Sequence, residues 1–219
     1  MYDPEHRLAW PARGYRWATE RLYHEFAWAY DAVSWLVSLG RWSGWRRQAL
    51  AYVGGPRVLE LGFGTGELLI EMAGRGWQAV GLERSPAMQR VTARKLRRQG
   101  LRVPRLCGAA QALPLAAASL DAIVATFPAD YILAPGTWHE AARALRPGGR
   151  LVIAGLFVEL DLPALRPGYS SATQRIAARL QALAAAAGLA LTRHADETAR
   201  VRAPVYVAEK SGAAGGPGA

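Results

Sequence analysis

The sequence predicts an α/β fold in which a doubly wound, mostly parallel sheet of seven strands carries helices on both faces. From Arg57 onward, short apolar runs alternate with stretches of helical character. A glycine-dense turn, Gly62 to Gly66, directly follows the first apolar run. The residues before 56 lack this alternation and have helical periodicity instead, which predicts an N-terminal helical cap over residues 1–55.

Length and composition indicate one globular domain. Of the 219 residues, 51% are hydrophobic and 20% are charged, as in folded soluble proteins. No apolar run approaches the roughly 18 residues that span a bilayer, and the first residues lack the layout of a signal peptide. We therefore expect a cytoplasmic protein. Cys107 is the single cysteine, so it forms no intramolecular disulfide, and its apolar surroundings predict a buried side chain.

The N-terminal region is rich in aromatic residues. One helical face is predicted from residues that recur at steps of three and four, namely Tyr23, Phe26, Tyr30, Val33 and Val37. Trp28 and Trp35 lie on a neighbouring face, and Gly40 is expected to end the helix. Such a helix has more apolar width than packing on one core requires, which predicts contact with an apolar molecule.

The remaining elements follow in order along the chain. Strands are expected at 57–61, 78–83, 102–107, 120–126, 150–157, 189–194 and 204–210. Helices are expected after Gly66 and at 85–98, 137–145 and 170–187. Ser85 followed by Pro86 is a helix start, because serine caps free amides and proline suits the first helical position. Residues 56–210 then form the main domain, and the glycine- and alanine-rich residues 211–219 a disordered tail.

The glycine turn and its acids predict the ligand. Glycine at 62, 64 and 66 permits positive φ and close approach of a ligand, while the next helix offers free amides. A dinucleotide fingerprint would need glycine where Glu67 stands. Glu60 adds a second acid, so an amino group or positive charge suits this turn better than a pyrophosphate. Glu83 closes the second strand 21 positions after Gly62, near the roughly 20 expected for an acid that binds ribose hydroxyls.

Four segments carry a family resemblance across about residues 56–210. They are "VLELGFGTGELL", "VGLERSPAM", "ALPLAAASLDAIVAT" and "EAARALRPGGRLVIAG", and they resemble the class I S-adenosylmethionine-dependent methyltransferases (methyltransferase type 11 domain), which have a Rossmann-like fold. The resemblance implies S-adenosylmethionine as cofactor and no metal. The cofactor-binding residues that it implies are Tyr30, Glu60, Gly62, Phe63, Gly64, Thr65, Gly66, Glu83, Arg84, Ala110, Gln111 and Thr126.

Within this pattern, Glu60 and the glycine turn would hold the methionine end and Glu83 the ribose, while residues 109–111 would line the adenine. One position departs from the family. The family commonly has Gly-Asp-Ala at 108–110, whereas this chain has alanine at position 109. The carboxylate partner of the adenine amino group is therefore missing, so Gln111 or backbone groups must substitute, and weaker cofactor binding is expected.

A narrower resemblance lies upstream, in "YDAVSWLVSLGRWSGWRR". This segment is similar to the ubiquinone/menaquinone-biosynthesis C-methyltransferases, which often have asparagine where Ser34 stands. The positions that match are Tyr30, Asp31, Ser38, Gly40, Trp45 and Arg46. The similarity favours a small apolar or lipid-like acceptor of the quinone or phenol type.

No catalytic residue is assigned from the sequence, because a methyl already activated on a sulfonium requires alignment more than a catalyst. If the acceptor is a phenol or an enol carbon, a base would help. The candidates are Tyr23, His24, Asp130, Tyr131 and His139. The segment "TFPADY", residues 126–131, is expected at the strand tips where an acceptor enters.

Charge leaves two alternatives open. The net charge is +10, and no acidic residue lies between Glu83 and Asp121. The basic residues of this interval are Arg84, Arg90, Arg94, Lys95, Arg97, Arg98, Arg102 and Arg105. They form either a solvated helix face or a surface for the phosphates of lipid or nucleic acid. The arginines therefore leave an RNA or protein methyltransferase open beside a small-molecule enzyme with peripheral membrane contact, and Ala109 leaves open a non-catalytic cofactor-binding protein.

Overall fold

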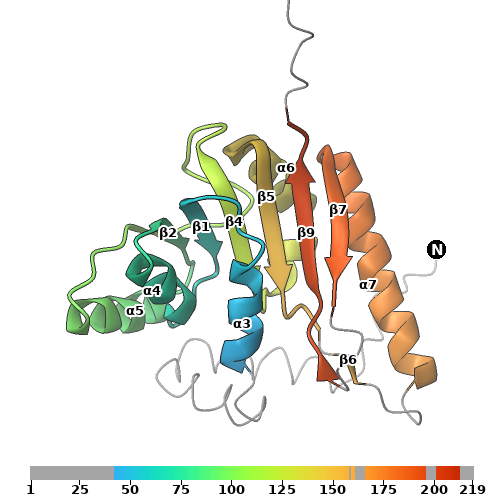
Figure 1. Cartoon of the computed structure of the whole chain (residues 1–219), viewed down its shortest axis with the longest axis horizontal. Helices are drawn as coiled ribbons and strands as arrows, with labels where there is room; N and C mark the ends of the chain where they lie inside the picture. Colours follow the sequence, from blue (N-terminus) through green and yellow to red (C-terminus); the bar gives the residue numbers. More distant parts are fainter. Residues whose placement is uncertain (1–41, 158, 161–165, 196–200, 213–219) are drawn as a thin grey trace, which may run out of the picture.

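A computed structural model describes residues 42–157, 159–160, 166–195 and 201–212 (Figure 1). The helices are α3 (Trp42–Leu50), α4 (Glu67–Gly74), α5 (Pro86–Arg98), the 3-10 turn η2 (Asp130–Leu133), α6 (Pro135–Ala144) and α7 (Arg166–Ala186). The strands are β1 (Arg57–Leu61), β2 (Gln78–Leu82), β3 (Arg105–Leu106), β4 (Leu120–Thr126), β5 (Leu145–Ala154), β6 (Glu159–Leu160), β7 (Leu189–His194), β8 (Val201–Arg202) and β9 (Val205–Lys210). The expected helix with Tyr30 and most of the expected tail lie outside the described residues.

The main sheet has seven strands in the order β3-β2-β1-β4-β5-β9-β7. Strands β1 to β5 pair in parallel, and β9 runs antiparallel to both of its neighbours, β5 and β7. The doubly wound, mostly parallel sheet that the sequence predicts is therefore confirmed. Strands β1, β2 and β3 follow one another toward one edge of the sheet, and β4 and β5 are then added on the other side of β1. The order of the strands therefore reverses between β1 and β4, and sheets of this kind bind ligands at the carboxyl ends of the strands at that point.

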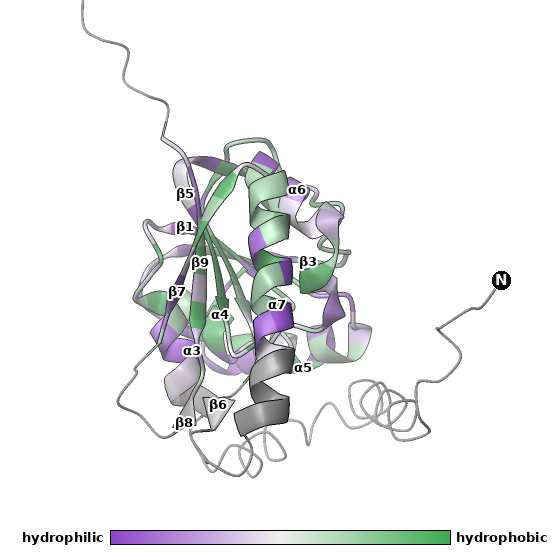
Figure 2. Cartoon of the chain, turned by 90° about the vertical axis from the view of Figure 1, so that its right-hand side faces the viewer, coloured by the Kyte–Doolittle hydropathy of each residue, from purple (hydrophilic) through white to green (hydrophobic). Residues whose placement is uncertain are grey.

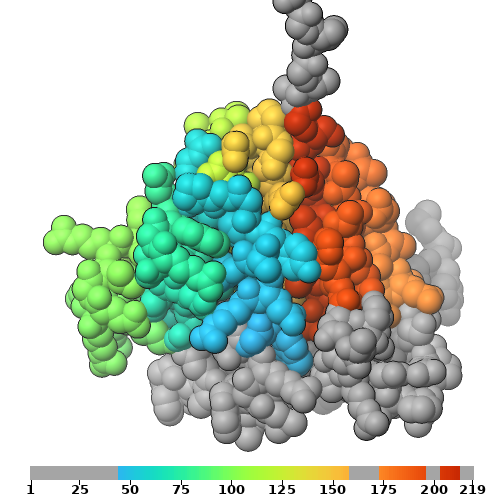
Figure 3. Space-filling view, viewed as in Figure 1, coloured from blue at the N-terminus to red at the C-terminus, as the bar shows by residue number. Residues whose placement is uncertain are grey.

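Helices cover both faces of the sheet, as Figure 2 shows from the side. On one face, α3 lies over β4 and β5 beside α4 (Figures 1 and 3), and Leu50, Leu69 and Met72 pack there against Val58 and Val124. On the other face, α6 and α7 enclose a second core. Burial on both faces explains why the central strands are continuous apolar runs.

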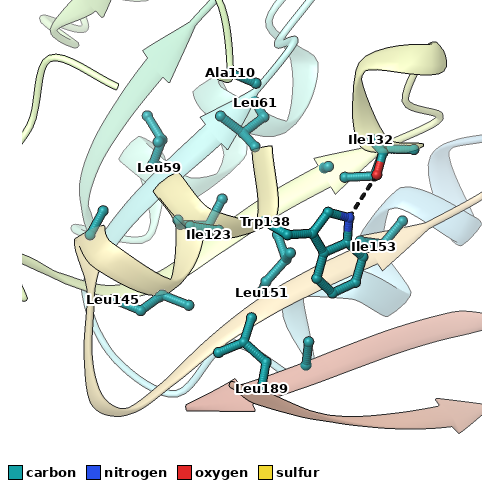
Figure 4. Packing of buried hydrophobic residues seen from close by; sticks show 14 of the residues in the cluster. Leu59, Leu61, Ala110, Ile123, Ile132, Trp138, Leu145, Leu151, Ile153 and Leu189 are labelled. Carbon is teal, nitrogen blue, oxygen red and sulfur yellow. Dashed lines mark hydrogen bonds between the residues drawn. The ribbon is translucent and has the colours of Figure 1, made fainter. Parts of the chain in front are cut away.

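Trp138 on α6 is the largest side chain in this second core, and it is fully buried. Its indole Nε1 donates a hydrogen bond to the Ile132 carbonyl over 2.8 Å (Figure 4). The bond satisfies the one polar atom of the ring and fixes η2 to α6. Since η2 follows the tip of β4, this buried contact positions the loop that borders the ligand cavity.

A buried acid ties the amino end of β1 to β4. Asp121 accepts hydrogen bonds from the Arg57 backbone amide at 2.9 Å and from the Arg57 guanidinium at 2.8 Å and 3.2 Å, and it also forms an ion pair with Arg146. The Arg57 guanidinium holds the pKa of Asp121 at about 2, well below its ordinary value of 3.8, although burial opposes this effect. The contact fixes the register of the central strands at the end remote from the cavity.

The start of α5 is as predicted, and the segment after it is not. Ser85 is the N-cap, its Oγ accepts a hydrogen bond from the Met88 amide at 3.4 Å, and proline follows at the first helical position. The prediction of a strand over 102–107 is wrong in length, because β3 holds only two residues and Pro104 has no amide hydrogen to donate to a ladder. Cys107, predicted to be buried, is exposed.

Three features were not anticipated. Helix α3 begins at Trp42, just after the glycine expected to end an earlier helix. The turn η2 and the two-stranded sheet of β6 and β8 have no strong sequence signal, since each is only two to four residues long. Among the described residues, no helix is both long and apolar enough to cross a bilayer.

Candidate functional site

The glycine turn between β1 and α4 adopts a conformation that side chains disfavour. Gly62 and Gly66 have φ of +66° and +79°, values that glycine takes without strain. A Cβ on Gly66 would lie 2.3 Å from Cγ2 of Thr92, and the Thr92 hydroxyl donates a hydrogen bond to the Gly64 carbonyl over 3.0 Å. The turn is thus packed against α5 and held in one shape, with its free edge toward the strand tips.

Glu83 lies beside this turn with its carboxylate oriented by two backbone amides. It is 6% exposed. Its Oε2 accepts a hydrogen bond from the Gly64 amide at 3.0 Å, and its Oε1 accepts one from the Ser85 amide at 2.8 Å. These bonds fix the acid at the end of β2, where a ribose would meet its remaining lone pairs.

Glu60 is the second acid, and one of its oxygens is unsatisfied. The residue is 2% exposed, and among the described residues Oε2 has no hydrogen-bond partner. Burial raises the pKa of Glu60 to about 8, partly offset by the charge of Arg46 on α3 and by a hydrogen bond from the Leu69 amide, while Glu83 raises it further. A buried carboxyl with one unsatisfied oxygen fits a cationic group of a ligand.

A cavity of about 410 Å³ opens at the carboxyl ends of β1, β2, β3 and β4. Its lining comes from four consecutive strand ends and from η2: Gly62, Leu82, Glu83, Arg84, Ser85, Gly108, Ala109, Ala110, Gln111, Phe127, Pro128, Ala129, Asp130, Tyr131 and Ala134. This volume is within the range of small-molecule sites, which is roughly 300–1,000 Å³. Glu83 follows β2 and Phe127 follows β4, so these two residues come from opposite sides of β1, while Asp130 and Tyr131 come from η2.

Five residues expected from the sequence to bind a cofactor line this cavity: Gly62, Glu83, Arg84, Ala110 and Gln111. The other predicted residues that the structure describes, Glu60 among them, do not line it. Phe63 is buried, and its ring packs where a side chain on Gly81 would be. Thr65 is buried within the turn, and Thr126 ends β4 one residue before the lining. Gly64 and Gly66 act through the turn, and Tyr30 lies outside the described residues.

Tyr131 packs against the start of the glycine turn. Its hydroxyl donates a hydrogen bond to the Leu61 carbonyl over 3.0 Å, and the same oxygen lies 2.9 Å from the position of a Cβ on Gly62. Burial, with the nearby charges of Glu83 and Glu60, raises the pKa of Tyr131 far above its usual range. The phenol therefore stays neutral, which disfavours the base role considered for it and favours a structural role against the turn.

Of the other candidate bases, the structure places one at the cavity and one away from it. Asp130 lines the cavity and is exposed. His139 lies exposed on α6 and does not line the cavity. Tyr23 and His24 lie outside the described residues. Asp130 is thus the acid that the described structure places where an acceptor would enter.

Phe127 belongs to the segment 126–131 expected at the strand tips, but its unusual backbone was not anticipated from the sequence. Its φ is +48°, a conformation that costs a bulky residue of the order of 1 kcal/mol or more. Its ring fills the space left by Gly155, where a Cβ would lie 2.3 Å from Cε1. The ring of Trp45 on α3 is 6.4 Å away between centroids. A strained aromatic residue therefore lies on the cavity wall and is accommodated by a glycine.

The donor set fits S-adenosylmethionine. The unsatisfied carboxyl of Glu60 matches an ammonium or sulfonium charge, and Glu83 matches ribose hydroxyls. The small residues Gly108, Ala109 and Ala110 line the cavity with Gln111, where an adenine ring would have room. Among the described residues, no three histidine, cysteine or acidic side chains come together as metal ligands.

Comparison with known sequences gives consistent matches. A model of the methyltransferase domain matches residues 58–149. The demethylmenaquinone methyltransferase of Thermus thermophilus is 38% identical over 60% of this chain and 63% of its own length. The demethylmenaquinone methyltransferase of Renibacterium salmoninarum is 32% identical over 74% of this chain and 67% of its own. The chain thus spans less than two thirds of the Thermus relative.

Solved structures agree on the fold. A geranyl diphosphate C-methyltransferase from Streptomyces coelicolor superimposes with a TM-score of 0.59 at 14% identity, over 77% of this chain and 79% of that one. A phosphoethanolamine N-methyltransferase from Haemonchus contortus gives 0.59 at 16% identity, over 78% and 53%. Sequence and fold together place the chain in one family. It belongs to the class I S-adenosylmethionine-dependent methyltransferases, of the type that includes the demethylmenaquinone and ubiquinone/menaquinone C-methyltransferases.

Proposed function

We propose that this protein transfers a methyl group from S-adenosylmethionine to a small, planar, apolar acceptor of the quinol or phenol type. The observation that carries the proposal is the two-sided cavity, with Glu83 on one wall and the strained ring of Phe127 on the other. The names of the two bacterial relatives, both demethylmenaquinone methyltransferases, support a quinol acceptor.

The acidic wall would bind and orient the cofactor. Glu83 is pre-oriented by two amides, so ribose hydroxyls meet an acceptor that does not need to reorganise. Glu60, which is buried behind the lining residues, would direct its unsatisfied oxygen to the positively charged end. When bound, the cofactor supplies a methyl group already activated on a sulfonium.

The apolar wall would align the acceptor and exclude water. Phe127, directly after β4, lines the cavity and has the ring of Trp45 from α3 beside it, and an aromatic acceptor stacks favourably on such a ring. Methylation at a quinol carbon forms one C–C bond, breaks one S–C bond and releases one proton. Asp130, exposed at the cavity rim, is the carboxylate available to take that proton or pass it to water.

Residues 1–55 are proposed to form a cap over this cavity. Within this region, the described part is α3 and the turn after it, and α3 provides Trp45 next to Phe127 and the charge of Arg46 toward Glu60. Both residues belong to the segment that resembles the C-methyltransferases. Removing residues 1–45 should abolish acceptor turnover and leave much of the cofactor binding, and normal turnover by the shortened chain would contradict the cap.

The test has two stages. Calorimetry with S-adenosylmethionine and S-adenosylhomocysteine measures cofactor binding, and a methyl-labelled donor is then used with a panel of demethylnaphthoquinols, benzoquinols and simple phenols. Label transfer to a quinol with release of S-adenosylhomocysteine supports the proposal. Binding without transfer to any of these acceptors contradicts the acceptor class, while absence of binding contradicts the proposal as a whole.

A further inference from the structure

A second cavity lies outside the proposed active site, between α5 and the edge strand β3. It measures about 380 Å³ and is lined by Arg90, Ala93, Arg94, Arg97 and Arg105. Four of the five lining residues are arginines, and none of the five lines the larger cavity. The groove is at the end of the sheet where α5 lies beside α4 (Figure 1). We refer to these five residues as the arginine groove.

The charges of the arginine groove are not neutralised within the described structure. Arg90, Arg94 and Arg97 are exposed, and none of the groove arginines forms an ion pair with a described acidic residue. Lys95, which is adjacent in sequence, behaves differently because it pairs with Glu67. The groove therefore concentrates positive charge that no described acidic residue neutralises, whereas Lys95 forms an ion pair with Glu67.

Helical geometry makes this concentration costly without a ligand. Positions 90, 94 and 97 are four and three residues apart, so their side chains share one stripe of α5, opposite the buried Met88, Thr92 and Leu96. Like charges at these spacings destabilise a helix by a few tenths of a kcal/mol per pair. An anion bound among these arginines would offset their mutual repulsion and stabilise the helix.

Arg105 gives the groove a fixed donor. Its Nη1 donates a hydrogen bond to the Gln89 carbonyl on α5 over 2.9 Å, and its Nε is buried without a described acceptor. The guanidinium is thus held in place from β3 across to α5 before any ligand arrives. Charge on an edge strand also discourages aggregation, but that role accounts for Arg105 alone and not for the three arginines of α5.

We propose that the arginine groove is a phosphate-binding site. Arginine is the side chain best suited to phosphate, because its planar fork donates two parallel hydrogen bonds. Four guanidinium groups around one small depression match a single phosphate group rather than an extended strand. The phosphate belongs to a phospholipid headgroup or to a small phosphorylated molecule, and the site is independent of the methyl acceptor.

The test compares two charge-matched variants of the full chain. The double variant Arg94→Gln/Arg97→Gln removes two groove arginines, and Arg98→Gln/Arg102→Gln removes two arginines of the same segment that do not line the groove. Binding is measured with inorganic phosphate by calorimetry, and with phosphatidylglycerol/phosphatidylcholine vesicles against pure phosphatidylcholine vesicles by sedimentation. We expect at least a tenfold loss for the groove variant and less than a twofold loss for the control.

The two probes separate the sources of the phosphate. Loss of phosphate binding identifies a soluble ligand, and loss of vesicle binding alone identifies a headgroup. Arg94→Lys, which keeps the charge and loses the fork, should retain less than half of the binding, while S-adenosylmethionine binding and thermal unfolding stay unchanged. Equal losses in both double variants, no binding of either probe by the unaltered chain, or binding of single-stranded RNA alone would each overturn the proposal.

Discussion

At the residue scale, Glu60 is a side chain that suits a cationic ligand but lowers the stability of the folded chain. The folded chain holds its proton more tightly than the unfolded chain, since burial raises the pKa from 4.5 to about 8. The free energy of unfolding therefore decreases as the pH rises from about 4.5 to about 8 and is level above that. An uncompensated carboxyl of this kind is expected where a cationic ligand completes the charge balance.

Replacing Glu60 with glutamine should remove this pH dependence. Glu60→Gln is expected to unfold at a higher temperature than the unaltered chain at pH 9 and at a similar temperature at pH 5, while binding S-adenosylmethionine about tenfold more weakly, as befits the loss of a charged hydrogen bond. Thermal unfolding and calorimetry at both pH values measure this. Glu71→Gln, whose carboxylate pairs with Arg75 on the surface, is the control, and an equal stability gain in both variants would refute the assignment.

Ala109 is a residue where binding should be easy to improve. It lines the cavity and is exposed, at the position where related methyltransferases commonly have aspartate. Ala109→Asp should tighten S-adenosylmethionine binding by about tenfold, since a hydrogen bond to a charged group contributes roughly 1.5 kcal/mol. Ala117→Asp, outside the cavity, should change the dissociation constant by less than twofold, and calorimetry that finds both variants alike would contradict this reading of the adenine site.

Gly155 controls the position of the Phe127 ring. Gly155→Ala would place a methyl group 2.3 Å from that ring, whereas Gly148 has a similar φ of +74° and open space around it. Both substitutions cost about 1 kcal/mol of backbone strain, but only the first displaces the ring. With a short-chain demethylnaphthoquinol we expect Gly155→Ala to raise the acceptor KM at least fivefold and Gly148→Ala to leave it within twofold. The same KM for both would exclude Phe127 from acceptor binding.

At the scale of elements, the bridge from Arg57 to Asp121 supports the central strands. Asp121→Asn should lower the free energy of unfolding by about 2 kcal/mol, because the Arg57 amide and two partly exposed arginines lose hydrogen bonds to a charged acid. Since the pKa of Asp121 is lowered to about 2, its stabilisation is present above pH 3.8 and is lost as the pH falls toward 2. Urea unfolding at pH 7 and pH 2 checks both statements, and a loss of under 1 kcal/mol at pH 7, as for surface pairs, would contradict them.

The elements also show which features of the fold can be predicted from neighbouring residues in the sequence. Ser85 and Pro86 mark the start of α5 correctly because capping depends on neighbours in sequence. The short β3 and the exposed Cys107 were mispredicted because pairing at a sheet edge depends on a partner strand and on Pro104. Helix α3 was not predicted from the sequence, because its contacts are with β4, β5 and Phe127, which are distant in the chain.

At the scale of the whole molecule, the sheet, the glycine turn with Glu83 and the position of residues 126–131 at the strand tips were predictable from the sequence, and the packing of the aromatic residues was not. The glycine turn, Glu60 and Glu83 occupy one crossover, so their spacing along the chain defines their arrangement in space. Phe127, Tyr131 and Gly155 come from segments that meet only after folding. Their roles depend on a positive φ, a hydroxyl bond to Leu61 and a missing side chain, none of which has a sequence pattern.

The most direct measurement is calorimetric titration of the full chain with S-adenosylhomocysteine, made in parallel on Glu83→Ala and on Arg84→Ala. Both residues line the cavity, but only the first offers an acceptor to ribose. We expect one site per chain and at least tenfold weaker binding for Glu83→Ala than for Arg84→Ala, since two lost hydrogen bonds to a charged group exceed about 1.4 kcal/mol. Undiminished binding by Glu83→Ala would contradict it.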